Sequence, residues 1–310
     1  MVNVLVTGGT GYVGSVLVPR LLKGGHRVTV IDNLMYGTGH IVLGLLKDKH
    51  FAFVKGDVRD RATMEPLIRS HDVIVHLAAI VGFPACEKNQ EAAVSTNVGA
   101  TKLLSSLLSK EQLVLYASTG SNYGQVESVC TEETPLKPLS LYGTTKTQAE
   151  EWLVQNNTAI AYRFATAFGL SPRMRLDLLI NDFVYQAVVN QYLIMFEKAF
   201  KRTFIHVDDM AASFLFAMEN AGRMQGNVYN VGDNRSNFTK EDIALKIAAK
   251  VQYYLHFADI GEDKDKRNYE VSYAKINSLG FQCDVSVDNG IDELIGAIPV
   301  LEHRSQYRNV

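Results

Sequence analysis

The sequence has few cysteines and no long apolar run. Its 310 residues contain three cysteines, Cys86, Cys130 and Cys283, at wide spacings and without a CxxC pair. An odd number in this arrangement predicts neither a disulfide framework nor a zinc site. No apolar run reaches the ~18 residues that span a bilayer, and the first one, VNVLVTGG, breaks into glycine too early for a signal peptide. We therefore expect a cytoplasmic protein without a membrane partner or a bound metal.

The chain also lacks an excess of charge of either sign. Its net charge is −2 at pH 7, and no run of lysine or arginine stands out. Because nucleic-acid binders carry a basic field that attracts phosphates, nucleic acid is not expected as a partner. With 47% hydrophobic and 21% charged residues, the chain can bury a substantial core, in one large domain or two smaller ones.

Short apolar runs alternate with helical patterns through the first half of the chain. Each run is apolar almost throughout, which is typical of strands buried on both faces of a parallel sheet. The alternation predicts an α/β fold with a doubly wound parallel (Rossmann) sheet, whose ligands bind at the carboxyl ends of the strands. The expected strands are 3–8, 27–32, 51–57, 73–79, 113–119 and 160–166, and the expected helices between them are 12–25, 61–71, 92–110 and 144–157.

After about residue 165 this rhythm changes. Longer helical patterns, at 178–191 and 239–252, are set among loops, and no internal repeat is visible. We predict a first domain over 1–165, with part of about 203–233 packing back on it, and a smaller α+β domain over 166–310.

A glycine-rich loop follows the first expected strand. In TGGTGYVG, the residues Gly8, Gly11 and Gly14 allow a tight turn and close approach of the backbone to a pyrophosphate at a helix N-terminus. The next strand ends in Asp32, 18 residues after Gly14, where an acid can bind the adenosine ribose hydroxyls of NAD and repel a 2′-phosphate. Asn33 follows, and no arginine stands there to pair with that phosphate. The loop and the acid together predict an NAD site.

Two further strand ends could contribute to this site. Asp57, which precedes Val58, could accept a hydrogen bond from the adenine amino group, or it could cap a helix. The small residues of HLAA, residues 76–79, leave room for a cofactor, although packing also explains them.

The stretch LYGTTK places a tyrosine and a lysine four positions apart. On a helix, Tyr142 and Lys146 would share one face, so that the ammonium could stabilise a phenolate. Many tyrosine and lysine pairs without a catalytic role have the same spacing. The spacing alone therefore leaves open whether this pair is catalytic or only shares a helix face.

Several motifs together resemble one family. The glycine loop with Asp32, HLAA, Asn97 in STNVGATKLL, ASTGSNYG and YGTTK occur in the order seen in the extended short-chain dehydrogenase/reductase family. The later RTFIHVDDMA and VYNVGD resemble its nucleotide-sugar branch, which includes UDP-galactose 4-epimerase-like enzymes. Matching elements run from Val2 to about Phe281.

The resemblance implies a catalytic role for Tyr142. The phenol would take a proton from a sugar hydroxyl while hydride leaves the same carbon for NAD, and Lys146 would stabilise the phenolate and hold the nicotinamide ribose. Thr119 resembles the family's serine or threonine that binds the reacting oxygen, with Ser118 as a weaker candidate. The implied cofactor-binding residues are Gly8, Gly11, Tyr12, Val13, Gly14, Asp32, Asn33, Asp57, Val58, Leu77, Ala78, Ala79, Asn97, Tyr142 and Lys146.

Departures from the family pattern narrow the reaction. Gly120 and Ser121 stand where 4,6-dehydratases of the family carry an Asp-Glu pair for acid and base chemistry, so a dehydratase is disfavoured. An epimerase that works through a 4-keto intermediate is favoured, and an NAD(P)H-dependent reductase of a nucleotide-linked 4-keto sugar is the alternative. A non-catalytic dinucleotide-binding protein and an RNA-binding member of the superfamily are further alternatives.

The resemblance also implies a nucleotide-diphosphate sugar as the partner, bound mainly by the second domain, and a homodimer. Arg173 and Arg175 in SPRMRLD are additional phosphate-binding candidates, but we favour the interpretation of this stretch as a charged loop without that role. The candidate substrate-binding residues are Val81, Phe83, Thr119, Ser121, Asn122, Asn181, Arg202 and Arg267.

Overall fold

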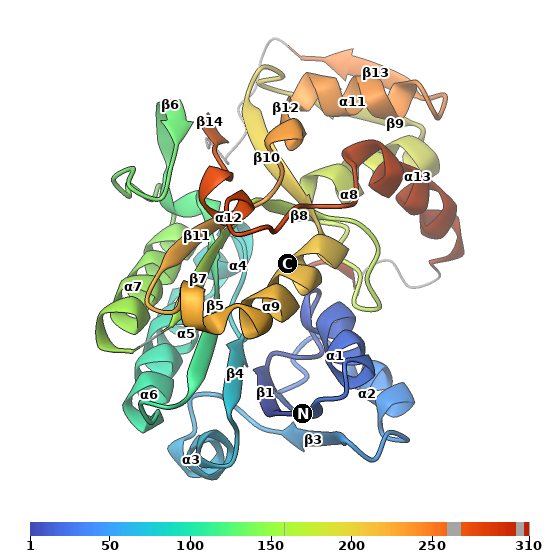
Figure 1. Ribbon diagram of the computed structural model, residues 1–310. Coiled ribbons are helices and arrows are strands. Elements are labelled where there is room, and N and C mark those ends of the chain that lie inside the picture. The colour runs from blue at the N-terminus through green and yellow to red at the C-terminus, as the bar shows by residue number, and fades with distance from the viewer. Residues whose placement is uncertain (158, 259–267, 302–306, 310) are drawn as a thin grey trace.

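The computed structural model describes residues 1–157, 159–258, 268–301 and 307–309. A seven-stranded sheet with helices on both faces forms the larger part of the molecule, and smaller sheets and helices form the rest (Figure 1). Every neighbouring pair in the large sheet is parallel. Its strands, in spatial order, are β11 (Val228–Val231), β7 (Ile160–Phe164), β5 (Leu113–Thr119), β4 (Val73–His76), β1 (Asn3–Thr7), β2 (Arg27–Asp32) and β3 (Phe51–Lys55).

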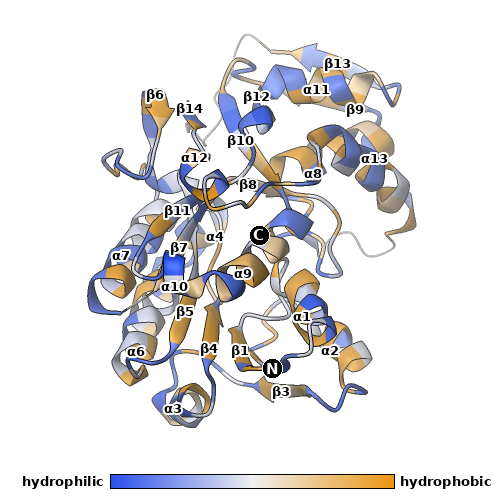
Figure 2. Cartoon of the chain, in the orientation of Figure 1, coloured by the Kyte–Doolittle hydropathy of each residue, from blue (hydrophilic) through white to orange (hydrophobic). Residues whose placement is uncertain are grey.

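This sheet confirms the predicted doubly wound fold. All residues of β4 and β7 are buried, as expected for strands covered on both faces. Figure 2 shows β1, β4 and β5 as mainly hydrophobic. The seventh strand, β11, was not predicted because it lies after residue 165, outside the part of the chain where strand and helix patterns alternate regularly.

The helices that cover the sheet largely follow the predicted segments. The pattern over 92–110 is one helical run interrupted by a π-turn, η1 (Ser95–Gly99). The bounds of the helices are α1 (Gly14–Lys23), α2 (Gly39–Leu45), α3 (Arg61–Arg69), α4 (Phe83–Lys88), α5 (Gln90–Val94), α6 (Ala100–Leu107), α7 (Leu141–Asn156), α9 (Val207–Glu219) and α10 (Ala221–Met224).

Helix α7 begins earlier than predicted. The hydroxyl of Ser140 accepts a hydrogen bond from the Gly143 amide and so caps the helix N-terminus. Tyr142 therefore lies in the first turn of α7 and Lys146 one turn later, on the same helix.

The remaining strands and helices gather mostly around a second hydrophobic core. Helix α9 packs against α1, and Arg20 forms an ion pair of 2.7 Å with Asp208 between them. The strands are β8 (Thr166–Phe168), β9 (Tyr192–Met195), β10 (Lys201–His206), β12 (Asn237–Thr239), β13 (Tyr254–Phe257), and the separate pair β6 (Gln125–Cys130) and β14 (Asn268–Val271). The helices are α8 (Leu179–Tyr185), α11 (Lys240–Ala248), α12 (Ala274–Asn277) and α13 (Val287–Ala297), with short turns η2 (Gly120–Asn122), η3 (Gln186–Asn190), η4 (Asn234–Ser236) and η5 (Ile298–Val300). Among the described residues, no helix has the length and apolar content needed to cross a membrane.

Candidate active site

A cavity of about 1070 Å³ is lined both by the carboxyl ends of the central strands and by the second group of elements. Of the predicted site residues that the structure describes, Asn97, Asn122 and Asn181 are not among its lining residues, and Arg267 lies outside the described residues. The predicted residues that line the cavity are Gly8, Gly11, Tyr12, Val13, Gly14, Asp32, Asn33, Asp57, Val58, Leu77, Ala78, Ala79, Val81, Phe83, Ser118, Thr119, Ser121, Tyr142, Lys146 and Arg202.

The glycine loop forms a narrow cradle at one end of this cavity. Gly8 has φ +70°, and a Cβ there would lie 2.8 Å from the Cα of Ala78. A Cβ on Gly14 would lie 2.6 Å from the Cα of Gly9, so the loop turns tightly against itself. Helix α1 starts after Val13 without a side-chain cap, which leaves its N-terminus available to an anion.

Asp32 connects the cradle to the end of β2. Its Oδ1 accepts a hydrogen bond of 2.8 Å from the Leu34 amide, and its Oδ2 accepts one of 3.2 Å from the Thr10 amide. Each carboxylate oxygen keeps a lone pair for a further donor such as a ribose hydroxyl.

Asp57 lines the cavity and forms an ion pair within the chain, and its contact with adenine stays a prediction. It pairs with Arg59 at 2.6 Å, and this hydrogen bond lowers the pKa of the Asp57 carboxyl. The alternative that Asp57 caps a helix is wrong, because the N-cap of α3 is Asp60, which accepts from the Ala62 amide.

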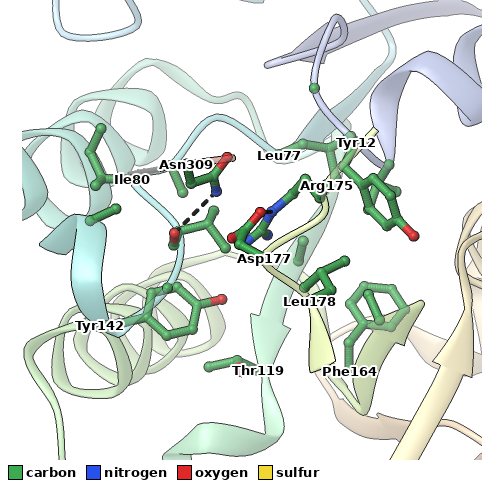
Figure 3. Close-up of a pocket in the computed structure, with 18 of the residues that line it drawn as sticks. Tyr12, Leu77, Ile80, Thr119, Tyr142, Phe164, Arg175, Asp177, Leu178 and Asn309 are labelled. Atoms are coloured by element: carbon green, nitrogen blue, oxygen red, sulfur yellow. Dashed lines mark hydrogen bonds and ion pairs between the residues drawn. The ribbon is translucent and has the colours of Figure 1, made fainter. Parts of the chain in front are cut away.

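The Lys146 side chain is buried beside the cavity. Its Nζ lies 4.0 Å from the centroid of the Tyr116 ring, close enough for a cation–π interaction. Burial lowers the pKa of Lys146 to about 7, while the negative charge of Glu150 opposes this shift. Figure 3 shows the Tyr142 ring extending into the same cavity from α7.

The adjacent residues Ser118 and Thr119 use their hydroxyl groups differently. Ser118 donates a hydrogen bond of 2.5 Å to Oε2 of Glu150, in the core beneath α7. Thr119 donates to the Ser121 hydroxyl at 3.1 Å and accepts from the Ser121 amide at 3.2 Å. Because successive strand residues point to opposite faces, the Thr119 hydroxyl is the better placed of the two to meet a ligand.

Asn122 belongs to the buried polar network that contains Ser118. Its Nδ2 donates to the Ser118 hydroxyl and to Glu150, which in turn pairs with Arg163 at 2.6 Å. The exposed fractions of the Arg163 and Glu150 side chains are 7% and 2%, so this network supports the wall of the cavity from behind.

Asn97 and Asn181 also hold the walls. The Asn97 carboxamide accepts from the Ile80 amide at 2.8 Å and donates to the Ile80 carbonyl and to Thr145 on α7, both at 3.0 Å. Asn181 accepts from the Gly169 amide and donates to the carbonyl of Arg175. The family resemblance located both residues, but only the structure shows that their amides bind the backbone.

The structure places several further side chains in the cavity. Arg173 and Arg175 lie on the loop between β8 and α8, and both are largely buried there: the exposed fraction of Arg173 is 3% and that of the Arg175 side chain is 11%. Arg175 forms a bidentate pair with Asp177 at 2.5 and 3.2 Å. Figure 3 shows this pair and Asn309 directed into the cavity. The motif SPRMRLD had indicated the two arginines as candidate site residues, whereas nothing in the sequence indicated Asn309.

Known proteins resemble this chain over nearly its whole length. The sequence pattern of the NAD dependent epimerase/dehydratase family matches residues 4–232. The low-salt glycan biosynthesis protein Agl12 of Haloferax volcanii is 29% identical over 306 residues, which cover 94% of this chain and 97% of that protein. A dTDP-glucose 4,6-dehydratase of an Actinoplanes species is 27% identical over 314 residues, which cover 94% of this chain and 96% of the relative.

Solved structures share the fold. Pal from Bacillus thuringiensis has a TM-score of 0.86 at 21% identity, with 97% of this chain and 100% of that chain covered. The UDP-glucuronic acid 4-epimerase from Bacillus cereus, solved in complex with UDP-glucuronic acid and NAD, has a TM-score of 0.84 at 25% identity. That comparison covers 96% of this chain and 99% of the epimerase.

Proposed function

The chain belongs to the NAD dependent epimerase/dehydratase family, and from this premise we propose that it is a nucleotide-sugar epimerase that works through a 4-keto intermediate. Membership confirms the resemblance to the nucleotide-sugar branch of the extended short-chain dehydrogenases, and NAD is the cofactor. The observation that carries the proposal is that Tyr142, Lys146 and Thr119 line the same cavity as the glycine cradle.

The cradle and Asp32 fit NAD. The amides at the start of α1 can bind the pyrophosphate, and the Asp32 carboxylate can accept hydrogen bonds from the adenosine ribose. A 2′-phosphate would bring a second anion to Asp32, which disfavours NADP. When bound, NAD supplies the acceptor and donor for the hydride that leaves and returns to C4 of the sugar.

The chain itself supplies the proton chemistry. We assign Tyr142 as the base that takes the proton of the C4 hydroxyl through its phenolic oxygen and later returns it. The Lys146 ammonium, on the same helix, stabilises the phenolate form. The Thr119 hydroxyl, which donates to Ser121 in this structure, would turn its proton to the C4 oxygen when substrate binds. The Ser118 hydroxyl stays in the Glu150 network.

The site lacks the acid that a dehydratase of the family would use. Gly120 takes the place of an aspartate, and a Cβ there would lie 3.2 Å from both the Phe164 carbonyl oxygen and the Tyr269 hydroxyl. A carboxylate at this position would therefore require the wall to move. Although relatives include a dTDP-glucose 4,6-dehydratase, this contact favours epimerisation.

The other end of the cavity suits a nucleotide diphosphate. Arg202 on β10 lines it with an exposed fraction of 1%, and a guanidinium can donate two hydrogen bonds to a phosphate. The similarity to an epimerase solved with UDP-glucuronic acid supports the same class of substrate here. The contacts of Arg202 and Arg267 with substrate stay predictions.

We also propose a homodimer through α5, α6 and α7. Val94 on α5 and Trp152 on α7 are exposed large hydrophobic residues, and a contact between copies would remove them from water. Sedimentation of the wild-type protein and of the variant Trp152→Glu should give a dimer and a monomer, respectively.

The proposed reaction can be tested without added cofactor. Freshly purified protein would be incubated separately with UDP-, dTDP-, GDP- and CDP-linked hexoses, and the coupling constants of the sugar H4 proton followed by NMR. We expect one of these sugars to reach a mixture of C4 epimers. If no sugar is isomerised but a nucleotide-linked 4-keto sugar is reduced with consumption of NADH or NADPH, the protein is a reductase and the proposal is wrong.

A further inference from the structure

Arg173 is a buried cation without a counterion among the residues that the structure describes. Its exposed fraction is 3%, and among the described residues it forms no ion pair with a carboxylate. Its Nη1 donates to the Met174 carbonyl at 2.9 Å and its Nη2 to Oδ1 of Asn309 at 2.7 Å. The neighbouring Arg175, in contrast, has Asp177 as its own counterion. Since burying an unpaired charge costs free energy, Arg173 is suited to receive an anion from a ligand.

The loop that carries Arg173 is attached to the start of α1. The Arg173 amide donates to the Ser15 hydroxyl at 3.4 Å, directly after Gly14 of the cradle. The hydroxyl of Ser171 lies 2.9 Å from that of Ser15 and donates to the Tyr12 carbonyl at 2.7 Å. These contacts fix Arg173 beside the helix N-terminus that faces the cofactor's pyrophosphate.

A second loop from the cofactor side covers the Arg173 guanidinium. The guanidinium carbon of Arg173 lies 4.6 Å from the centroid of the Tyr36 ring. Tyr36 is four residues past Asp32, which lies at the end of β2. That loop is joined to the cradle by a hydrogen bond of 2.7 Å between the hydroxyls of Thr38 and Thr10. This cation–π contact holds the guanidinium in place without occupying its N–H donors.

We propose that Arg173 binds the pyrophosphate of the dinucleotide opposite the glycine cradle, with Tyr36 and Asn309 as the residues that position its guanidinium. This inference rests on the NAD site of the proposed function. A planar guanidinium suits the task because its remaining N–H groups can reach two phosphate oxygens at once. The pyrophosphate would then lie between the amides of α1 and the arginine.

Asn309 links Arg173 to the other side of the cofactor groove. While its Oδ1 accepts from Arg173, its Nδ2 donates to the Val81 carbonyl at 3.2 Å (Figure 3). Val81 follows Leu77–Ala79, which line the cavity at the end of β4. An amide at this position orients the guanidinium and leaves its positive charge for the ligand, whereas a carboxylate would neutralise it.

The test compares ligands with and without phosphate. Protein freed of its dinucleotide would be titrated calorimetrically with ADP-ribose, with adenosine and, separately, with UDP. Arg173→Met should raise the Kd of ADP-ribose by about tenfold or more and leave that of adenosine unchanged, because only ADP-ribose carries the pyrophosphate. The variant should also reduce the dependence of ADP-ribose binding on salt concentration.

Two further variants complete the design. Asn309→Asp should weaken ADP-ribose selectively as well, since it gives Arg173 a carboxylate, and it keeps the proposal testable if Arg173→Met does not fold. Arg308→Gln is the matched control: Arg308 lies on the same segment but pairs with Asp182 at 3.0 Å and does not line the cavity. It should leave both affinities unchanged.

Three results would overturn the inference. Equal weakening of adenosine and ADP-ribose by Arg173→Met would assign it a structural role. Unchanged ADP-ribose binding with weakened UDP binding would move Arg173 to the substrate's diphosphate. Wild-type protein that binds neither adenosine nor ADP-ribose would reject the NAD site itself, and this binding result does not depend on whether any sugar is epimerised.

Discussion

Two buried cations near Glu150, Lys146 on α7 and Arg163 on β7, differ in whether a carboxylate among the described residues forms an ion pair with them. Arg163 donates to both carboxylate oxygens of Glu150, to the Tyr123 hydroxyl and to the Glu132 carbonyl. Lys146 lies over the Tyr116 ring, and burial lowers its pKa to about 7. Arg163 belongs to the support of the site, and Lys146 lines the cavity.

The same contrast recurs across the cavity in Arg175 and Arg173. Arg175 is paired with Asp177, while Arg173 has only neutral partners among the described residues. Removing one partner of a buried ion pair destabilises the fold, whereas a buried cation without a counterion is a candidate for binding a charged ligand or intermediate. Four substitutions test this contrast.

The largest expected effect belongs to Tyr142→Phe. In the proposed mechanism Lys146 stabilises the phenolate form of Tyr142, which acts as the base. Removing the phenolic oxygen should therefore lower turnover by roughly 10²- to 10⁴-fold. The cradle is untouched, so the NAD content of the purified variant should match that of the wild-type protein. Turnover would be measured with the sugar identified by NMR, and a variant with normal turnover would show that Tyr142 is not the base.

Arg163→Met should be the most destabilising of the four. It leaves Glu150 buried without its counterion, which typically costs about 3–5 kcal/mol. Urea unfolding would measure the loss. The double variant Glu150→Gln with Arg163→Met should recover part of it, and a double variant less stable than either single variant would contradict the assignment of this pair as mutually compensating.

Lys146→Met should lose activity yet gain stability. In the folded state the pKa of Lys146 is about 7, below its ordinary value of 10.5, so the folded protein holds this proton less tightly than the unfolded chain. Burying this ammonium lowers the free energy of unfolding of the wild-type protein. The loss is fully present below pH 7 and disappears as the pH rises toward 10.5. The difference in melting temperature should therefore shrink over this range, and a constant difference would argue against a buried ammonium.

Asp208→Asn should have the smallest effect. The ion pair between Arg20 and Asp208 is exposed, at 38% and 40% of the two side chains, and such pairs contribute about 0.2–1 kcal/mol. Urea unfolding at low and high salt should show a small loss that salt removes. If Asp208→Asn lowered the free energy of unfolding as much as Arg163→Met does, burial would not explain the difference between the exposed and the buried ion pair.

The parts of the site that sequence reasoning located are those encoded locally. Gly8 to Gly14, Asp32, and the pair Tyr142 and Lys146 each depend on short spacings next to a strand or within a helix, and these are visible in the chain. Six of the seven strands were predicted for the same reason, whereas β11 follows the second group of elements, where no regular alternation marks it as part of the large sheet.

The parts that it missed depend on contacts between distant segments. Arg173 and Asn309 are 136 residues apart, and their contact depends on tertiary packing that no spacing encodes. The choice between Ser118 and Thr119 required the position of Glu150, 32 residues later. For SPRMRLD, the charged residues predicted only a charged loop. Because arginines are usually exposed, only the structure shows that these two are largely buried.

The measurement that tests the account most directly is the dinucleotide released when freshly purified protein is denatured. We expect near-stoichiometric NAD, because an epimerase of this kind would keep and recycle its cofactor between turnovers. Release of NADP, or protein that carries no dinucleotide and binds neither NAD nor NADH when they are added, would contradict it.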